Sequence, residues 1–114
     1  MSRIYKIIST PEWRAAEAAG VFHGAAIDLT DGYIHFSTAE QARETAAKHF
    51  AGQADLLLVA VDAAHLGDAL KWEASRGGAL FPHLYAPLSL SAVTSVAPLP
   101  LAADGAHNFD GLLA

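Results

Sequence analysis

The sequence predicts a small α+β domain with a mostly antiparallel or split β-sheet and two short helices. Three observations carry this prediction: short runs of β-branched and aromatic residues, two helix-start signals, and one continuous apolar run bounded by aspartates. The length of 114 residues suits a single domain spanning residues 1–114. After about residue 100 the content of Ala, Asp, Gly and Asn predicts a draped or weakly ordered tail.

The chain is expected to open with a strand followed by a helix. Arg3–Ser9 alternates loosely between apolar and polar residues, which is typical of a strand. Ser9 or Thr10 can then cap a helix with Pro11 in its first turn, and Gly20 is a plausible stop. We expect Trp13 to anchor this helix to the core.

The next stretch is predicted to be a loop, a turn and a short strand. Val21–Leu29 shows no clean period, so we interpret it as a loop that leads to a turn at Asp31-Gly32. In the strand that follows, side chains alternate between faces. Ile34 and Phe36 can therefore enter a core, while the other face carries Tyr33, His35 and Ser37.

A second helix is predicted to start directly after that strand. Thr38 and Gln41 fit the capping box, in which the two side chains satisfy free backbone N–H groups of the first turn. The positive end of the helix dipole would then lie beside His35 and Ser37, where it favours anionic groups such as phosphate.

The second half of the chain contains the predicted centre of the sheet and two more strands. Leu56–Val61 is apolar throughout, which is typical of a strand buried on both faces. Leu70–Ser75 alternates and puts Lys71, Glu73 and Ser75 on one face, and residues 76–79 read as a glycine-rich loop. Val93–Leu99 has the composition of a final strand.

A rigid segment carries the second histidine of interest. Leu80–Leu88 contains two prolines, which fix φ and forbid a regular helix, so the segment is expected to be extended. His83 and Tyr85 then point to the same side. Pro98 indicates that the final strand lies at a sheet edge or ends there.

Composition limits the classes of partner. The net charge is −5 and the seven Lys and Arg residues are scattered, which argues against a large nucleic-acid ligand but leaves a small anionic ligand open. No apolar run approaches the roughly 20 residues of a membrane span, and the first residues lack the pattern of a signal peptide. We therefore expect no membrane partner and a cytoplasmic location. The absence of cysteine excludes thiolate catalysis.

The candidate site is a cleft built from three extended segments. Its residues are His35, Ser37, Glu73, His83 and Tyr85. Two histidines and one carboxylate could hold a divalent metal, but no closely spaced histidine pair supports this, and we predict no metal. The alternative is that both histidines are buried structural groups and the protein acts through a partner surface.

The motifs also resemble a known family. Gly-Tyr-Ile-His-Phe-Ser-Thr (residues 32–38), Trp72-Glu73 and Phe-Pro-His-Leu-Tyr-Ala-Pro-Leu (residues 81–88) look like those of short bacterial proteins catalogued as a domain of unknown function. The resemblance runs from Ile4 to Val93. By remote similarity that family is grouped with the ADP-ribosyltransferase fold, especially its histidine-bearing branch, which includes the RNA 2′-phosphotransferases.

This resemblance implies NAD or an ADP-ribosyl group as ligand and a transferase or glycohydrolase activity. The reaction would break the nicotinamide glycosidic bond through an oxocarbenium-like transition state. The implied catalytic residues are His35 on ribose or pyrophosphate, Glu73 near the developing charge, and His83 as a second contact or proton carrier. The implied cofactor-binding residues are Lys6, Ser37, Thr38 and Tyr85. A non-catalytic module that only binds a nucleotide or an anionic metabolite remains the alternative.

Overall fold

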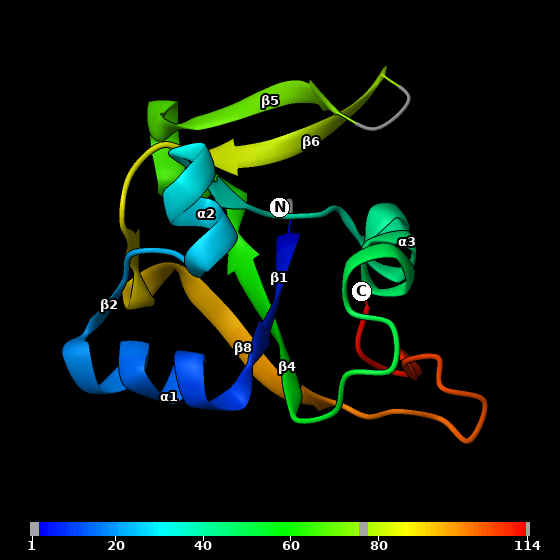
Figure 1. Ribbon diagram of the computed structural model, residues 1–114. Helices are drawn as coiled ribbons and strands as arrows, with labels where there is room; N and C mark the ends of the chain where they lie inside the picture. Colours follow the sequence, from blue (N-terminus) through cyan, green and yellow to red (C-terminus); the bar gives the residue numbers. More distant parts are fainter. Residues whose placement is uncertain (1–2, 76–77, 114) are drawn as a thin grey trace.

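The computed structural model describes residues 3–75 and 78–113 (Figure 1). In the element names below, η marks a 3-10 helix. In chain order the elements are β1 (Arg3–Ser9), α1 (Thr10–Ala19), β2 (Val21–Phe22), α2 (Ala26–Asp31), β3 (Ile34–His35), α3 (Ala39–His49), β4 (Leu56–Asp62), η1 (Ala63–Ala69), β5 (Leu70–Ser75), β6 (Ala79–Leu84), β7 (Leu88–Ser89), η3 (Leu90–Ala92) and β8 (Val93–Leu99).

The strands form a split antiparallel sheet. One half has the order β1-β4-β8, the other has the order β3-β6-β5, and β2 pairs separately with β7. Among residues 3–75 and 78–113, the two halves are joined by one antiparallel bridge, between Tyr5 and Ser37, in which the backbone N–H groups donate to the opposite carbonyls at 2.8 and 2.9 Å. The prediction of an α+β domain with an antiparallel sheet is confirmed. In Figure 1 the β5–β6 hairpin lies above the β1-β4-β8 half.

The predicted central strand is confirmed. β4 lies between β1 and β8, and residues 56–61 are all buried. A central strand whose two faces are both covered by other elements buries its side chains on both sides, so apolar residues are favoured at every position. β8 is an edge strand, so Pro98 does not interrupt a ladder on its outer side.

Both predicted helix starts are confirmed. In α1 the Ser9 hydroxyl accepts from the backbone N–H of Glu12, and Gly20 ends the helix at φ 82°, in the left-handed region. Trp13 is 1 % exposed and lies 5.7 Å from the ring of Phe22, so it anchors α1 to the core. α3 begins with the complete capping box of Thr38 and Gln41.

The prediction of two helices is wrong, because the segment interpreted as a loop holds a strand and a third α-helix. β2 pairs with β7, and α2 runs from Ala26 to Asp31. The Asp28 carboxylate accepts from the backbone N–H of Ala25 at 2.8 Å and so supports the first turn. Gly32, at φ 88°, ends α2 rather than forming an isolated turn with Asp31. Six residues are too few to show a helical period.

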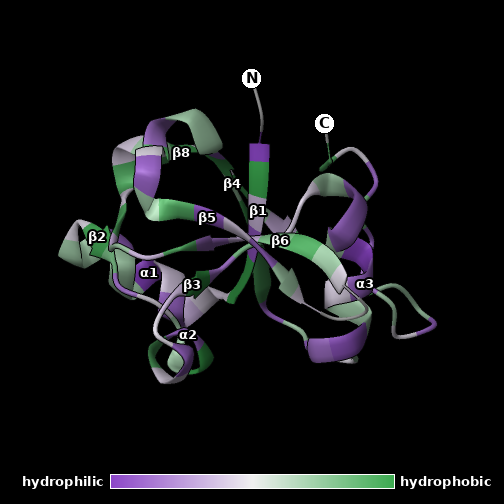
Figure 2. Ribbon diagram, turned by 90° about the horizontal axis from the view of Figure 1, so that it is seen from above, coloured by the Kyte–Doolittle hydropathy of each residue, from purple (hydrophilic) through white to green (hydrophobic). Residues whose placement is uncertain are grey.

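Two hydrophobic cores lie around the β1-β4-β8 sheet. One contains Ile4, Ile8 and Trp13 and reaches under α1, while the other contains Tyr5, Ile7 and the buried face of α3. The chain after β8 packs on the second core through Phe109, which is 2 % exposed and has the Arg43 guanidinium 5.3 Å from its ring centre. The ribbon of α3 is largely hydrophilic away from this contact (Figure 2).

Two further sequence predictions concern the loop after β5 and the absence of a membrane span. Residues 76–77 of the predicted glycine-rich loop lie outside the described residues. Within residues 3–75 and 78–113, no helix has the length and apolar content needed to span a membrane.

Candidate functional site

A cavity of about 350 Å³ opens where the two halves of the sheet meet. The single bridge between Tyr5 and Ser37 leaves β1 and β3 otherwise unpaired there, so side chains from both halves can line one space. Its walls come from β1, α2, β3, α3, β5 and β6. The lining residues are Tyr5, Lys6, Ile7, Ile27, Asp31, Tyr33, His35, Phe36, Ser37, Thr45, His49, Phe50, Ser75, Phe81 and His83.

His35 and His83 both line this cavity because they are direct partners in the β3–β6 ladder. Opposite residues in a ladder point to the same face. Their ring centres are 5.6 Å apart. The ladder therefore brings two of the predicted site residues to one open space.

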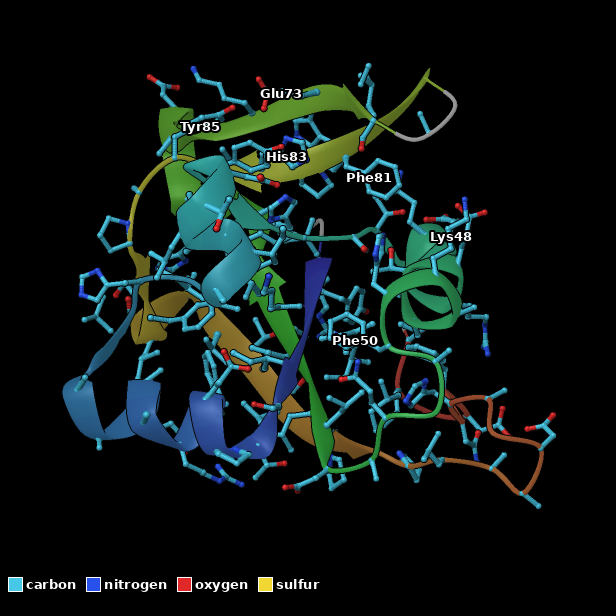
Figure 3. The ribbon with its side chains drawn as sticks, in the orientation of Figure 1. Lys48, Phe50, Glu73, Phe81, His83 and Tyr85 are labelled. Carbon is cyan, nitrogen blue, oxygen red and sulfur yellow. The ribbon has the colours of Figure 1, made fainter. Side chains whose placement is uncertain are left out.

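His83 and Tyr85 share one hydrogen-bond partner, the carboxylate of Glu73. Nδ1 of His83 lies 2.8 Å from Oε1 of Glu73, and the Tyr85 hydroxyl donates to the same oxygen at 2.7 Å. Figure 3 shows the three side chains gathered at one end of the β5–β6 hairpin, with Phe81 further along β6 towards α3. The hydrogen bond from Tyr85, followed by that from His83, lowers the pKa of Glu73, and the same contact raises the pKa of Tyr85 to about 12. Glu73 itself does not line the cavity but supports His83 from behind.

His35 makes a different set of contacts, and these occupy both of its ring nitrogens. Nδ1 lies 2.6 Å from Asp28 Oδ1 and Nε2 lies 2.9 Å from Asp31 Oδ2. Both contacts are hydrogen bonds at the same time only when both nitrogens carry protons, because the carboxylates can only accept. His35 therefore ties α2 to β3 and has no ring nitrogen left for a ligand in this arrangement.

Asp28 is the buried centre of this end of the site. Besides His35 it binds the Lys6 ammonium at 2.9 and 3.0 Å, and it is 2 % exposed. Burial acts to raise the pKa of Asp28, but the hydrogen bond from His35 and the charge of Lys6 outweigh it and lower the pKa to about 2. Burial lowers the pKa of Lys6, and Asp28 opposes that effect. The pair is thus a buried ion pair whose carboxylate also accepts hydrogen bonds from Ala25 and His35.

The lowered pKa of Asp28 predicts a loss of stability in acid. A carboxyl group whose pKa is lower in the folded state, about 2 against 3.8, stabilises the fold above the higher value and loses this contribution as the pH falls through the lower one. The expected loss between about pH 5 and pH 2 is about 2 kcal/mol in the free energy of unfolding. Urea unfolding across this range measures it. The Asp28→Asn variant should lose less over the same range, and an equal loss in both proteins would contradict the assignment.

Tyr33 forms an aromatic wall of the cavity. Its ring stacks on His83 with centres 4.1 Å apart and planes inclined by 27°, and it lies 4.6 Å from His35 and 5.2 Å from Tyr85. Burial, followed by the charges of Asp31 and Glu73, raises the pKa of the Tyr33 phenol. A second, smaller cavity of about 260 Å³ lies against Tyr33 and Tyr85.

The remaining predicted site residues are placed as follows. Ser37 lines the main cavity and shares a hydrogen bond of 2.8 Å with the Thr45 hydroxyl. Lys6 also lines it, with its ammonium on Asp28, whereas Tyr85 belongs to the smaller cavity. Thr38 caps α3 and does not line either cavity.

The sequence analysis missed Asp28 and Asp31 as members of the site. Their spacing of three residues would have placed both carboxylates on one face of a helix, but the segment was interpreted as a loop and a turn. Among the residues that the structure describes, no group of three or more His, Asp or Glu side chains could hold a metal ion.

Together the fold and the site define a small α+β domain with a split antiparallel sheet and a histidine- and tyrosine-lined cavity at the split. The chain belongs to the family described as "Protein of unknown function (DUF952)", whose model matches residues 7–96. The predicted resemblance to a family of unknown function is confirmed.

Solved structures support the fold directly. The chain is 60% identical to protein CC0527 from Caulobacter crescentus, with a TM-score of 0.92 to its X-ray crystal structure over 96% of each chain. The solution NMR structure of CC0527 gives a TM-score of 0.88 over 100% of this chain and 98% of that one. Among curated proteins, none matches the chain.

Proposed function

We propose that the cavity at the split of the sheet binds NAD or a related ADP-ribosyl nucleotide, and that the protein acts on it as an ADP-ribosyltransferase-like transferase or glycohydrolase. The observation that carries this proposal is the pair of His83 and Tyr33 at the wall of an open cavity, in contact with each other and backed by Glu73. The split sheet agrees with the remote resemblance to the ADP-ribosyltransferase fold.

The size and the walls of the cavity suit one end of such a nucleotide. Ligand pockets commonly range from about 300 to 1,000 Å³, so a cavity of about 350 Å³ accommodates the nicotinamide riboside part and leaves the rest of a dinucleotide outside. The faces of Tyr33 and Phe81 can pack on a planar ring.

The charges around the histidines favour the cationic end of NAD. Asp31 lines the cavity, and the carboxylates of Glu73 and Asp28 contact histidines that line it, Glu73 through His83 and Asp28 through His35. A nicotinamide ring carries positive charge in NAD, and the ribose carbon becomes positive when the glycosidic bond breaks. Carboxylates in a partly water-excluded site stabilise such charge. The pyrophosphate would then lie outside the cavity, on the side of α3, whose Thr45 and His49 line that part of the wall.

A second candidate function is binding without turnover. The specific observation in its favour is that both ring nitrogens of His35 are bound by carboxylates, which gives this histidine a supporting role. Release of nicotinamide from NAD, followed by chromatography, separates the two. An enzyme produces nicotinamide in proportion to its own concentration, and a binding module produces none.

Binding is tested by titration with NAD, ADP-ribose and nicotinamide, followed by thermal shift and calorimetry. A ligand that binds only the folded protein raises its melting temperature by mass action. The Tyr33→Ala variant should bind about 5- to 100-fold more weakly, because stacking of an aromatic ring on a base contributes about 1–3 kcal/mol. Trp72→Ala is the matched control, since Trp72 is 44 % exposed and lies outside both cavities.

Either of two outcomes would contradict the proposal. One is a well-folded wild type that gives no shift and no heat with any of the three compounds. The other is equal loss of binding in Tyr33→Ala and Trp72→Ala, because a ligand in the cavity contacts only the first of these side chains.

A further inference from the structure

We infer that His83 is a general base whose Nε2 accepts the proton of a water molecule or a neutral hydroxyl group, and that Glu73 is the positioning residue that keeps Nε2 free of hydrogen. The inference deepens the proposed function by naming the class of acceptor, and it rests on that function for the identity of the electrophile. It is carried by the contacts of His83, Glu73 and Tyr85.

The first step concerns which nitrogen of His83 carries the proton. Oε1 of Glu73 receives the Tyr85 hydroxyl at 2.7 Å and lies 2.8 Å from Nδ1 of His83. An ionised carboxylate has no hydrogen to donate, so Nδ1 must be the donor in this contact. A neutral imidazole has only one N–H group, and Nε2 is then left with its lone pair.

The second step concerns where Nε2 can act. His83 lines the main cavity, although only 4 % of its surface is exposed. The low exposure arises because His83 lies on the inner side of β6 and the ring of Tyr33 stacks on one face of its imidazole. Within residues 3–75 and 78–113, Nε2 of His83 has no hydrogen-bond partner. His35 differs, because carboxylates occupy both of its nitrogens. Of His35 and His83, only His83 has a ring nitrogen able to take a proton in this arrangement.

The third step is the reaction that this arrangement supports. The bond between the ribose carbon C1 and the nicotinamide nitrogen breaks, and its electron pair remains on nicotinamide, which leaves as a neutral molecule. The oxygen of water or of a hydroxyl group forms the new bond to C1, and its proton passes to Nε2. The resulting imidazolium is stabilised by the Glu73 carboxylate and returns the proton to solvent.

The titratable and aromatic groups around the His83 ring come from β5, from the β3 side and from the segment after β6. Glu73 and Lys71 face it from β5, with Lys71 as its direct partner in the β5–β6 ladder. Tyr33 and His35 face it from the β3 side, and Tyr85 follows it along the chain. Among these groups Glu73 is the only one in hydrogen-bond contact with the ring.

Nitrogen-15 NMR of histidine-labelled protein tests the inference without any nucleotide. Spectra are recorded at a pH well above the titration of the rings, and the signals of His83 are assigned from their loss in His83→Gln. We expect a protonated Nδ1 and an unprotonated Nε2 in the wild type. In Glu73→Ala the population with hydrogen on Nε2 should become the major one, whereas Tyr85→Phe, which keeps the carboxylate, should retain the wild-type signals.

A wild-type His83 with hydrogen on Nε2 would overturn the inference, as would a Glu73→Ala spectrum identical to that of the wild type. These outcomes are independent of the nucleotide titration. If the expected tautomer is found but NAD and ADP-ribose do not bind, the proposed function fails while His83 remains the proton acceptor of the cavity. If the nucleotides bind and the tautomer is the opposite one, only the inference fails.

Discussion

Replacing Asp28 with alanine is expected to lower the free energy of unfolding by about 3–5 kcal/mol. The reason is that Asp28 is the only carboxylate within ion-pair distance of the buried Lys6 among the described residues. Its removal also leaves the backbone N–H of Ala25 and Nδ1 of His35 without their acceptor. An uncompensated buried charge costs more than the intact pair contributes. Urea unfolding, followed by circular dichroism, measures the change.

Asp31→Ala is the matched control for this prediction. Asp31 contacts the same histidine from the same helix, but its side chain is 38% exposed, so the expected change is below about 1 kcal/mol. If Asp28→Ala does not fold, the double variant Lys6→Met/Asp28→Leu still tests the argument, because it removes both charges and should recover most of the stability. Equal effects of Asp28→Ala and Asp31→Ala would contradict the buried ion pair.

His83→Gln is expected to reduce the release of nicotinamide from NAD by about 10²- to 10⁴-fold, which is the usual contribution of a general base. Glutamine preserves polarity and much of the volume, so the dissociation constant for ADP-ribose should change by less than about tenfold. The rate is measured by chromatography of nicotinamide at saturating NAD, and the affinity by calorimetry.

His65→Gln serves as the control for that experiment. His65 is 58% exposed on η1 and lies outside both cavities, so the same substitution there should leave rate and affinity unchanged. A His83→Gln protein that keeps the wild-type rate would contradict the role of His83. A wild-type protein that binds NAD but releases no nicotinamide would restrict the function to binding.

Much of the fold could be predicted because its strongest signals are local. Leu56–Val61 is apolar on both faces, and a strand of this kind fits only the middle of a sheet, where β4 lies. The capping residues Ser9 and Thr38 act on N–H groups two or three positions away, so their roles are readable without tertiary information. α2 could not be predicted because six residues are too few to show a helical period, and because its Asp28 binds Lys6 of β1, 22 residues away.

The grouping of the candidate site could be predicted better than its chemistry. His83 and Tyr85 are two positions apart on a rigid segment, which put them on one side, and both bind Glu73 in the structure. The roles within the group depend on contacts between elements. The alternation of β3 could not show that both nitrogens of His35 would be bound by α2 carboxylates while one nitrogen of His83 would be left open.

The sequence by itself determined the antiparallel α+β class, the positions of the long strands along the chain, the start and end of α1 and the start of α3, because these depend on side-chain alternation and on capping within one turn. Only the tertiary structure decided that the sheet splits between β1 and β3, that a cavity opens there, and that Asp28 joins Lys6 to His35. These features depend on how segments that are distant in sequence pack against one another. A side chain binds whichever polar group this packing brings within hydrogen-bond distance.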